Sequence, residues 1–154
     1  MKLSELLKRE RITLTLGSET KEGVIEELFR LLVNSGEVKD AHEFMKSIEA
    51  REVMESTGIG NGIAIPHGIT DAVRSVICAV GISERGIDYG SLDGRPVHLV
   101  FLLGIPTREA RQYLGLLAQI CRLFGRGELP KEITHATSVG EVLESIAERE
   151  ATVS

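Results

Sequence analysis

Hydrophobic residues recur at the start of the chain at two spacings, and each spacing predicts one kind of element. Ser4 can cap a short helix that runs through Arg9. Ile12, Leu14 and Leu16 then alternate with polar residues, as the positions of a half-buried strand do. We therefore expect the chain to open with a helix followed by a strand.

Two longer helices, each with one apolar side, are predicted after this strand. Thr20 is placed to cap the first, which should close near residues 34–36. Asp40 is placed to start the second, which should reach about Arg51. Their apolar positions are Val24, Ile25, Leu28, Leu31, Leu32, Phe44, Met45 and Ile48. Such amphipathic helices are expected to pack on one sheet.

The middle of the chain carries the strongest strand signals. Residues 57–68 include four glycines and one proline, which indicate a shaped loop with short extended pieces. Residues 76–82 and 97–103 are short apolar runs rich in β-branched residues. Because glycines bound both runs, we expect them to be the central strands of a sheet.

Helical spacing returns in the last third of the chain. Thr107 can cap a helix through Phe124. The apolar stripe predicted for this helix is Leu114, Leu117, Cys121 and Phe124. Two short helices near residues 130–135 and 139–148 are expected to follow, and residues 150–154 are expected to form a loose tail. Strands that alternate with helices predict an α/β fold.

The composition is that of a globular protein and narrows the classes of partner. Of 154 residues, 42% are hydrophobic and 27% are charged. The net charge of −5 is spread along the chain, which disfavours nucleic acid and anionic membranes as partners. Residues 97–105 form the longest apolar run, too short for a membrane helix, and the N-terminus lacks a signal-peptide pattern. We expect a cytoplasmic protein without membrane insertion.

The cysteines and histidines show no metal-binding pattern. Cys78 and Cys121 lie in separate apolar runs and are expected to be buried free thiols of a reducing compartment. No pair of histidines or carboxylates has the spacing of metal ligands. The sequence therefore predicts neither a metal nor a cofactor.

His67 is the candidate reactive residue. Pro66 fixes its own φ and Gly68 lets the chain turn away, so the imidazole is expected to be exposed on a loop. A histidine with a pKa of about 6.5 is largely neutral near pH 7, and its free ring nitrogen can attack phosphorus. The preceding glycines offer backbone N–H groups for an anion-binding nest, to which Arg51, Ser56 and Thr57 would add one cation and two hydroxyls.

Each of these residues also has a simpler interpretation. Residues 66–68 can be a turn that contains a polar residue, Arg51 a solvated side chain at a helix end, and Thr57 a local cap. His98 lies within a predicted strand, where a hydrogen-bonded core histidine is the simpler reading. Taken singly, none of these residues identifies a site.

Together, these segments resemble a known signature. Arg51-Glu52, a four-residue gap and the continuous stretch 57–68 are similar to the signature of phosphotransferase system (PTS) enzyme IIA domains of the fructose–mannitol type. That family includes the nitrogen-regulatory IIA proteins. The resemblance continues through residues 94–103 and 113–118. It implies one α/β domain over residues 1–149, with a mixed sheet of about five strands flanked by helices on both faces.

The resemblance also implies an activity and partners. It implies a phosphotransferase component of sugar transport, in which His67 receives a phosphoryl group from phospho-HPr and hands it to an enzyme IIB domain. Arg51 would hold phosphate oxygens beside the phosphohistidine. Thr57 and Tyr113 would support the site.

Tyr113 is a departure from the family pattern. Members that carry phosphate usually have a second histidine at this position of the helix. Tyrosine can donate a hydrogen bond to a phosphate oxygen, but its ordinary pKa near 10 means that it supplies no positive charge near neutrality. Because Tyr113, Leu117 and Phe124 share helical spacing, an aromatic residue at the edge of the core is an equally good interpretation.

Two other functions stay open at this point. One is a nitrogen-regulatory module that binds a target protein according to its phosphorylation state, since a phosphate changes the surface charge. The other, weaker one is a metal-assisted hydrolase that uses His67 with His98 or His135. The sequence leaves open the sugar and the oligomeric state, a homodimer included.

Overall fold

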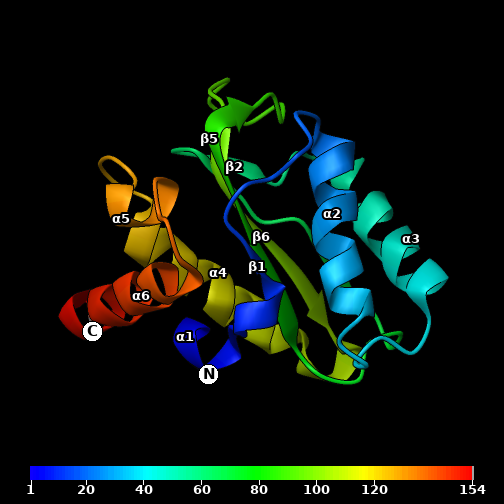
Figure 1. Cartoon of the computed structure of the whole chain (residues 1–154). Coiled ribbons are helices and arrows are strands. Elements are labelled where there is room, and N and C mark those ends of the chain that lie inside the picture. Colours follow the sequence, from blue (N-terminus) through cyan, green and yellow to red (C-terminus); the bar gives the residue numbers. More distant parts are fainter. Residues whose placement is uncertain (154) are drawn as a thin grey trace.

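Six strands form one mixed sheet in a computed structural model that describes residues 1–153 (Figure 1). The strands are β1 (Ile12–Thr13), β2 (Gly58–Gly60), β3 (Ile63–Ala64), β4 (His67–Ile69), β5 (Ile77–Ile87) and β6 (Val97–Ile105). Their order is β1-β5-β6-β3-β2, and β4 also pairs with β6. β5 and β6 are antiparallel at the centre, whereas β1 runs parallel to β5, and β3 and β4 run parallel to β6.

Helices cover both faces of this sheet, as predicted. They are α1 (Leu3–Leu6), α2 (Lys21–Val33), α3 (Ala41–Glu52), α4 (Ala110–Phe124), α5 (Lys131–Thr134) and α6 (Val139–Val153), with 3₁₀ turns η1 (Arg9–Arg11) and η2 (Thr107–Glu109). α2 and α3 lie on one face, and α1, α4, α5 and α6 lie on the other (Figure 1).

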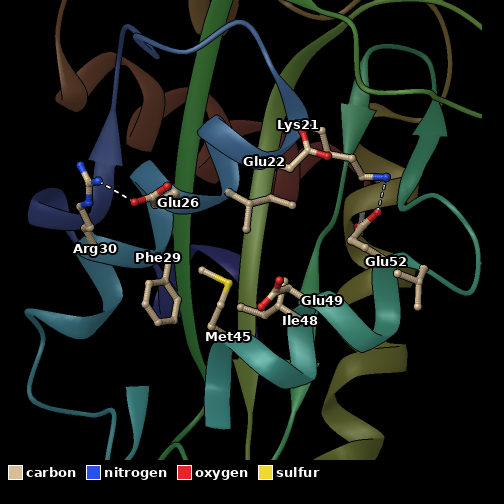
Figure 2. A pocket seen from close by; sticks show the side chains of 11 residues that line it. Lys21, Glu22, Glu26, Phe29, Arg30, Met45, Ile48, Glu49 and Glu52 are labelled. Carbon is tan, nitrogen blue, oxygen red and sulfur yellow. Dashed lines mark hydrogen bonds and ion pairs between the residues drawn. The ribbon is translucent and has the colours of Figure 1, made fainter. Parts of the chain in front are cut away.

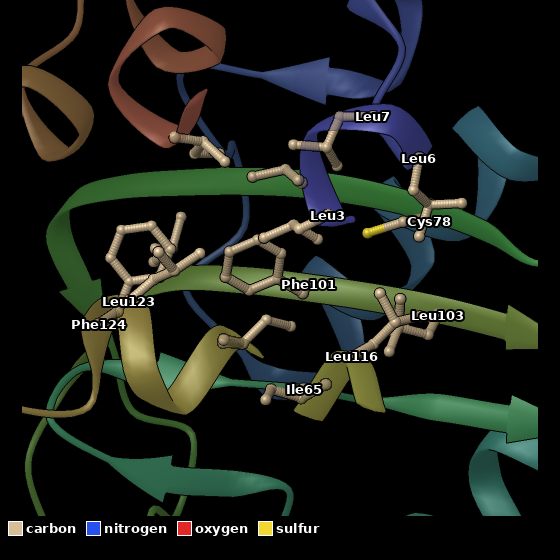
Figure 3. Packing of buried hydrophobic residues seen from close by; sticks show 14 of the residues in the cluster. Leu3, Leu6, Leu7, Ile65, Cys78, Phe101, Leu103, Leu116, Leu123 and Phe124 are labelled. Carbon is tan, nitrogen blue, oxygen red and sulfur yellow. The ribbon is translucent and has the colours of Figure 1, made fainter. Parts of the chain in front are cut away.

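The central strand β6 explains why the molecule has two core layers. Successive side chains of a strand point to opposite faces, so Phe101 and Leu103 pack under α1 and α4 (Figure 3) while Val100 and Leu102 pack under α2 and α3. All four side chains are fully buried. This is the expected burial of a continuous apolar run between two helical layers.

The predicted caps Thr20 and Asp40 are confirmed, whereas Thr107 lies in the 3₁₀ turn η2 and α4 begins at residue 110 without a side-chain cap. The hydroxyl of Thr20 accepts a hydrogen bond from the Gly23 amide at 3.1 Å, and a carboxylate oxygen of Asp40 accepts one from the Glu43 amide at 3.1 Å. Each cap satisfies one of the amides that the first helical turn leaves without a partner. The starts of α2 and α3 are thus fixed by local chemistry.

The first helix and the end of the last one differ from the prediction. α1 begins after Lys2 and ends at Leu6 instead of running from Ser4 to Arg9. β1 covers only residues 12–13 of the predicted strand. α6 continues to Val153 where a loose tail was expected from residue 150, and residue 154 lies outside the described part of the chain.

The buried stripe of α4 also differs from the predicted one. Leu114 is 65% exposed and Cys121 is exposed, while the buried residues of α4 are Leu116, Ile120, Leu123 and Phe124. Both sets have helical spacing, so periodicity alone could not choose between them. The prediction of a buried thiol is therefore wrong for Cys121. It is right for Cys78, whose pKa is raised by burial.

Candidate functional site

His67 is the first residue of β4 and is only 4% exposed. It pairs with Leu103 of β6, whose amide donates a hydrogen bond to the Pro66 carbonyl at 3.0 Å. On the other side, α3 packs directly on β4, since a Cβ added to Gly68 would collide with the Ser47 side chain. The prediction of an exposed loop histidine is wrong, because this segment is a strand held between β6 and α3.

One hydrogen bond fixes the protonation pattern of the imidazole. Nδ1 of His67 lies 2.9 Å from the carbonyl oxygen of Ile65. A carbonyl only accepts, so Nδ1 carries the proton, and Nε2 of the neutral ring keeps its lone pair. Burial is the largest effect on the pKa of His67 and lowers it. The Ile65 hydrogen bond raises this pKa, the Arg51 charge lowers it and the Glu52 charge raises it, each by less, and the net shift is downward. The ring is therefore neutral near pH 7 and nucleophilic at Nε2.

Tyr113 of α4 stacks on the imidazole. The two ring centroids are 4.1 Å apart and the rings are inclined by 27°. Stacking covers a face of the His67 ring, whereas the Nε2 lone pair lies in the ring plane and is not blocked by it. The pKa of Tyr113 is raised, chiefly by burial, so its hydroxyl stays protonated at neutral pH. Tyr113 also packs against the core, as the interpretation of an aromatic residue at the core edge predicts.

Arg51 brings a positive charge to the same place. It lies in the last turn of α3, and its Nη1 donates a hydrogen bond to the Glu55 carbonyl at 2.7 Å. The Arg51 charge acts on the pKa of both His67 and Tyr113, which puts the guanidinium in the neighbourhood of both rings. Within residues 1–153 Arg51 forms no ion pair. Its charge is therefore available to an anion.

Thr57 belongs to a buried cluster of polar side chains that includes Glu52, the residue after Arg51. The hydroxyls of Thr57 and Tyr89 are 2.8 Å apart, and both hydrogen-bond the Glu52 carboxylate, Tyr89 at 3.0 Å. Lys21 completes the cluster with an ion pair to Glu52 at 2.7 Å. The Thr57 hydroxyl is thus bound to Glu52 and Tyr89, and its contacts hold the end of α3 that carries Arg51.

The predicted glycine nest does not lie beside His67. Gly60, Asn61 and Gly62 have φ values of 103°, 56° and 78° and form the tip of the β2–β3 hairpin. Asn61 ties this tip to α4 through a hydrogen bond from its Nδ2 to the Phe124 carbonyl at 2.5 Å. Along β6, Ile63 pairs with residue 99 and His67 with residue 103. Four strand residues span about 13 Å, so these amides are too far away to bind a group on His67.

Sequence reasoning did not single out three members of the cluster: Lys21, Glu52 and Tyr89. Glu52 is part of the Arg51-Glu52 pair in the family signature, so the sequence marked its position but gave no indication of its role. Tyr89 gave no signal, because it reaches Glu52 across 37 residues of chain through a contact that only the folded sheet creates.

Residues 1–153 contain neither a metal-binding cluster nor a membrane-spanning helix. In that range no three histidine, cysteine or carboxylate side chains come together in a way that could hold a metal ion. None of the helices described there combines the length and the apolar composition needed to cross a membrane.

Comparison with known proteins identifies the family. Residues 5–149 match the family described as "Phosphoenolpyruvate-dependent sugar phosphotransferase system, EIIA 2", and the chain belongs to this family. It is 38% identical over 146 residues to the PTS system fructose-specific EIIABC component of Bacillus subtilis, covering 95% of this chain but only 23% of that protein. It is 33% identical over 146 residues to the fructose-specific EIIA component of Haloferax volcanii, covering 95% of each.

Solved structures of EIIA proteins share the fold. The nitrogen regulatory protein IIA-Ntr from Neisseria meningitidis superposes with a TM-score of 0.83 at 27% identity, covering 94% of this chain and 98% of that one. The mannitol IIA of Escherichia coli, solved in complex with phosphorylated enzyme IIB, gives 0.78 at 26% identity, covering 92% and 97%.

Proposed function

We propose that this EIIA-family protein carries a phosphoryl group on Nε2 of His67 in the cytoplasm. It accepts the group from phospho-HPr and passes it to an enzyme IIB domain of a sugar phosphotransferase system. The observation that carries the proposal is the hydrogen bond from Nδ1 to the Ile65 carbonyl, which leaves Nε2 as the nucleophile.

The bonds that form and break in the proposed phosphoryl transfer balance without a cofactor. The Nε2 lone pair forms a bond to phosphorus while the bond from phosphorus to the donor atom breaks, and that electron pair returns to the donor. Nδ1 keeps its proton and its hydrogen bond to Ile65, so the phosphorylated ring is an imidazolium with one positive charge, which the negative phosphoryl oxygens offset. The second transfer reverses these changes toward the acceptor. Positioning and charge stabilisation account for most catalysis of such transfers.

Arg51 and Tyr113 are the residues we assign to the phosphoryl oxygens. The Arg51 guanidinium has no ion-pair partner among residues 1–153 and can offer charge-assisted hydrogen bonds to them. The protonated Tyr113 hydroxyl can donate one more, from a ring that already packs on the imidazole. Thr57 contributes indirectly, by holding Glu52 and with it the end of α3.

The partners follow from relatives. The mannitol IIA of Escherichia coli forms a complex with phosphorylated IIB, which supports a IIB domain as the acceptor here. The fructose-specific relatives support sugar transport as the pathway. The likeness to the Neisseria nitrogen regulatory protein favours one second candidate, a regulatory module whose His67 phosphorylation controls binding to a target protein.

Phosphorylation with purified components tests the proposal. The protein is incubated with phosphoenolpyruvate, enzyme I and HPr, and the gain of one acid-labile phosphoryl group is followed by mass. A IIB domain is then added, and the group is expected to leave the protein. Lack of labelling in the wild type, under conditions that label a Tyr113→His variant, would contradict the carrier function. Labelling without onward transfer to any IIB domain would favour the regulatory module.

A further inference from the structure

A groove of about 650 Å³ lies between α2 and α3, on the side of these helices that faces solvent (Figure 2). Its floor is apolar and consists mainly of Ile25 and Phe29 from α2 and Met45 and Ile48 from α3. Ile25 and Ile48 are buried, while Phe29 and Met45 are half-buried and open to the groove. Pockets of roughly 300–1,000 Å³ with such a lining are typical small-molecule sites.

The rim of the groove carries an excess of negative charge. One end is lined by the ion pair of Lys21 with Glu52, and the α2 side by the pair of Glu26 with Arg30, both at 2.7 Å (Figure 2). Two further carboxylates, Glu22 on α2 and Glu49 on α3, line the groove and form no ion pair within the described residues. Four carboxylates against two cations leave a net charge of −2.

At the Glu52 end of the groove, the protein's own Lys21 ammonium group already occupies a site that favours a cation. Nζ of Lys21 contacts the Glu52 carboxylate and lies 4.9 Å from the centre of the Tyr89 ring. A carboxylate and an aromatic face are two groups that favour a cation. Since Lys21 occupies that position, the carboxylates left for another cation are those of Glu22 and Glu49.

We propose that the groove between α2 and α3 binds an organic cation, with its ammonium group at the Glu22 and Glu49 rim and its apolar body on the floor. Charge complementarity selects a cation over a neutral or anionic molecule. The floor selects a cation with an apolar body over a small hydrated one, because only the former removes apolar surface from water. The proposal is independent of phosphoryl transfer at His67.

Binding of 4-phenylbutylamine, followed by amide chemical shifts in NMR spectra of the full chain, tests this site. Shifts are expected to saturate and to map to α2 and α3. The neutral analogue 4-phenylbutan-1-ol is expected to bind roughly fivefold more weakly, because it lacks the charge. Methylamine, which lacks the apolar body, is expected to show no saturation in the same range. Equal affinity for amine and alcohol, or shifts elsewhere, would overturn the proposal.

Matched variants test the assigned carboxylates. The double variant Glu22→Gln/Glu49→Gln is expected to bind 4-phenylbutylamine at least about fivefold more weakly. Glu43→Gln removes an exposed carboxylate of α3 that does not line the groove and is expected to leave affinity unchanged. Equal losses of affinity in both variants would show that the effect comes from the overall charge of the protein, and would overturn the proposed site. Chemical-shift changes at the groove that appear when the protein is concentrated without ligand would also overturn the proposal. They would indicate that a second copy of the chain occupies the groove.

Discussion

His67 and His98 are two strand histidines that share the same hydrogen-bonding pattern at Nδ1 but have different surroundings. His67 begins β4, and His98 lies in β6. In each, Nδ1 lies 2.9 Å from a backbone carbonyl oxygen, that of Ile65 or of Ser83. In its neutral form, each ring therefore keeps its lone pair on Nε2. The tautomer alone does not distinguish a phosphoryl acceptor from a structural histidine.

The surroundings of Nε2 make the difference. A Cβ added to Gly86 would lie 3.4 Å from Nε2 of His98, so the backbone of β5 runs close to that edge of the ring. The pocket beside His98 contains two cations, Arg95 and Lys131, balanced by two carboxylates, Glu84 and Glu128. Next to His67 stands Arg51, without an ion-pair partner in residues 1–153. An uncompensated cation, rather than exposure, identifies the candidate site, since His67 is the more buried of the two histidines.

The largest expected effect comes from removing each imidazole in turn. His67→Ala is expected to abolish labelling by phospho-HPr, because no other ring nitrogen has the same combination of tautomer and cation. His98→Ala is expected to retain the wild-type stoichiometry of phosphate. Intact mass after incubation measures both, and circular dichroism confirms that the variants are folded. Retained labelling in His67→Ala would show that another residue accepts the phosphoryl group.

The second effect concerns the two arginines. Arg51→Ala is expected to slow phosphoryl transfer by about 10- to 100-fold, the size of a lost charge-assisted hydrogen bond. Arg95→Ala, beside His98, is the matched control and is expected to change the rate less than about twofold, since exposed charges away from a site contribute little. Rapid-quench labelling gives the rates. Equal rates for Arg51→Ala and wild type would show that Arg51 is only a surface charge.

The third effect concerns stability near Arg51. Thr57→Val removes a buried hydroxyl that hydrogen-bonds Glu52 and is expected to lower the free energy of unfolding by about 1–3 kcal/mol. Thr137→Val removes an exposed hydroxyl that bonds Glu141 at 2.7 Å and is expected to cost less than about 0.5 kcal/mol. Urea unfolding measures both. Similar small losses would mean that the cluster does not hold the end of α3.

The smallest effect is a pH dependence. The folded-state pKa of His67 lies below its ordinary value of 6.5, so on acidification the unfolded chain binds a proton at this residue first. The free energy of unfolding should therefore fall as pH drops below about 6.5, and level off below the folded-state pKa. His67→Asn should show a shallower fall than wild type between pH 7.5 and 5.5. Parallel curves for the two proteins would contradict the lowered pKa.

Local chemistry was predictable from the sequence, and tertiary pairing was not. Thr20 and Asp40 cap their helices through contacts three residues away, so the sequence alone identified them. The burial of His67 depends on β4 pairing with β6 and on α3 packing over Gly68, neither of which a local pattern reveals. The signature around His67 predicted Arg51 and Tyr113 as its companions, and both lie near it. The interpretation of residues 66–68 as a loop mistook a strand for a loop.

Two errors have the same physical origin. The sequence of α4 has apolar residues on two neighbouring stripes, and packing against β6 selects the one that contains Leu116 and Ile120. The glycines of residues 58–62 suggested an anion nest, but the hairpin register carries them away from His67. In both cases tertiary contacts between residues distant in sequence decided the outcome.

The most direct test of the account is the identity of the phosphorylated atom. Protein labelled with ¹⁵N-histidine is phosphorylated with phosphoenolpyruvate, enzyme I and HPr, and phosphorus–nitrogen coupling is measured by NMR. The account predicts one coupled nitrogen, Nε2 of His67, with Nδ1 still protonated and bound to Ile65. Coupling to Nδ1 of His67, or to any nitrogen of His98, would contradict it.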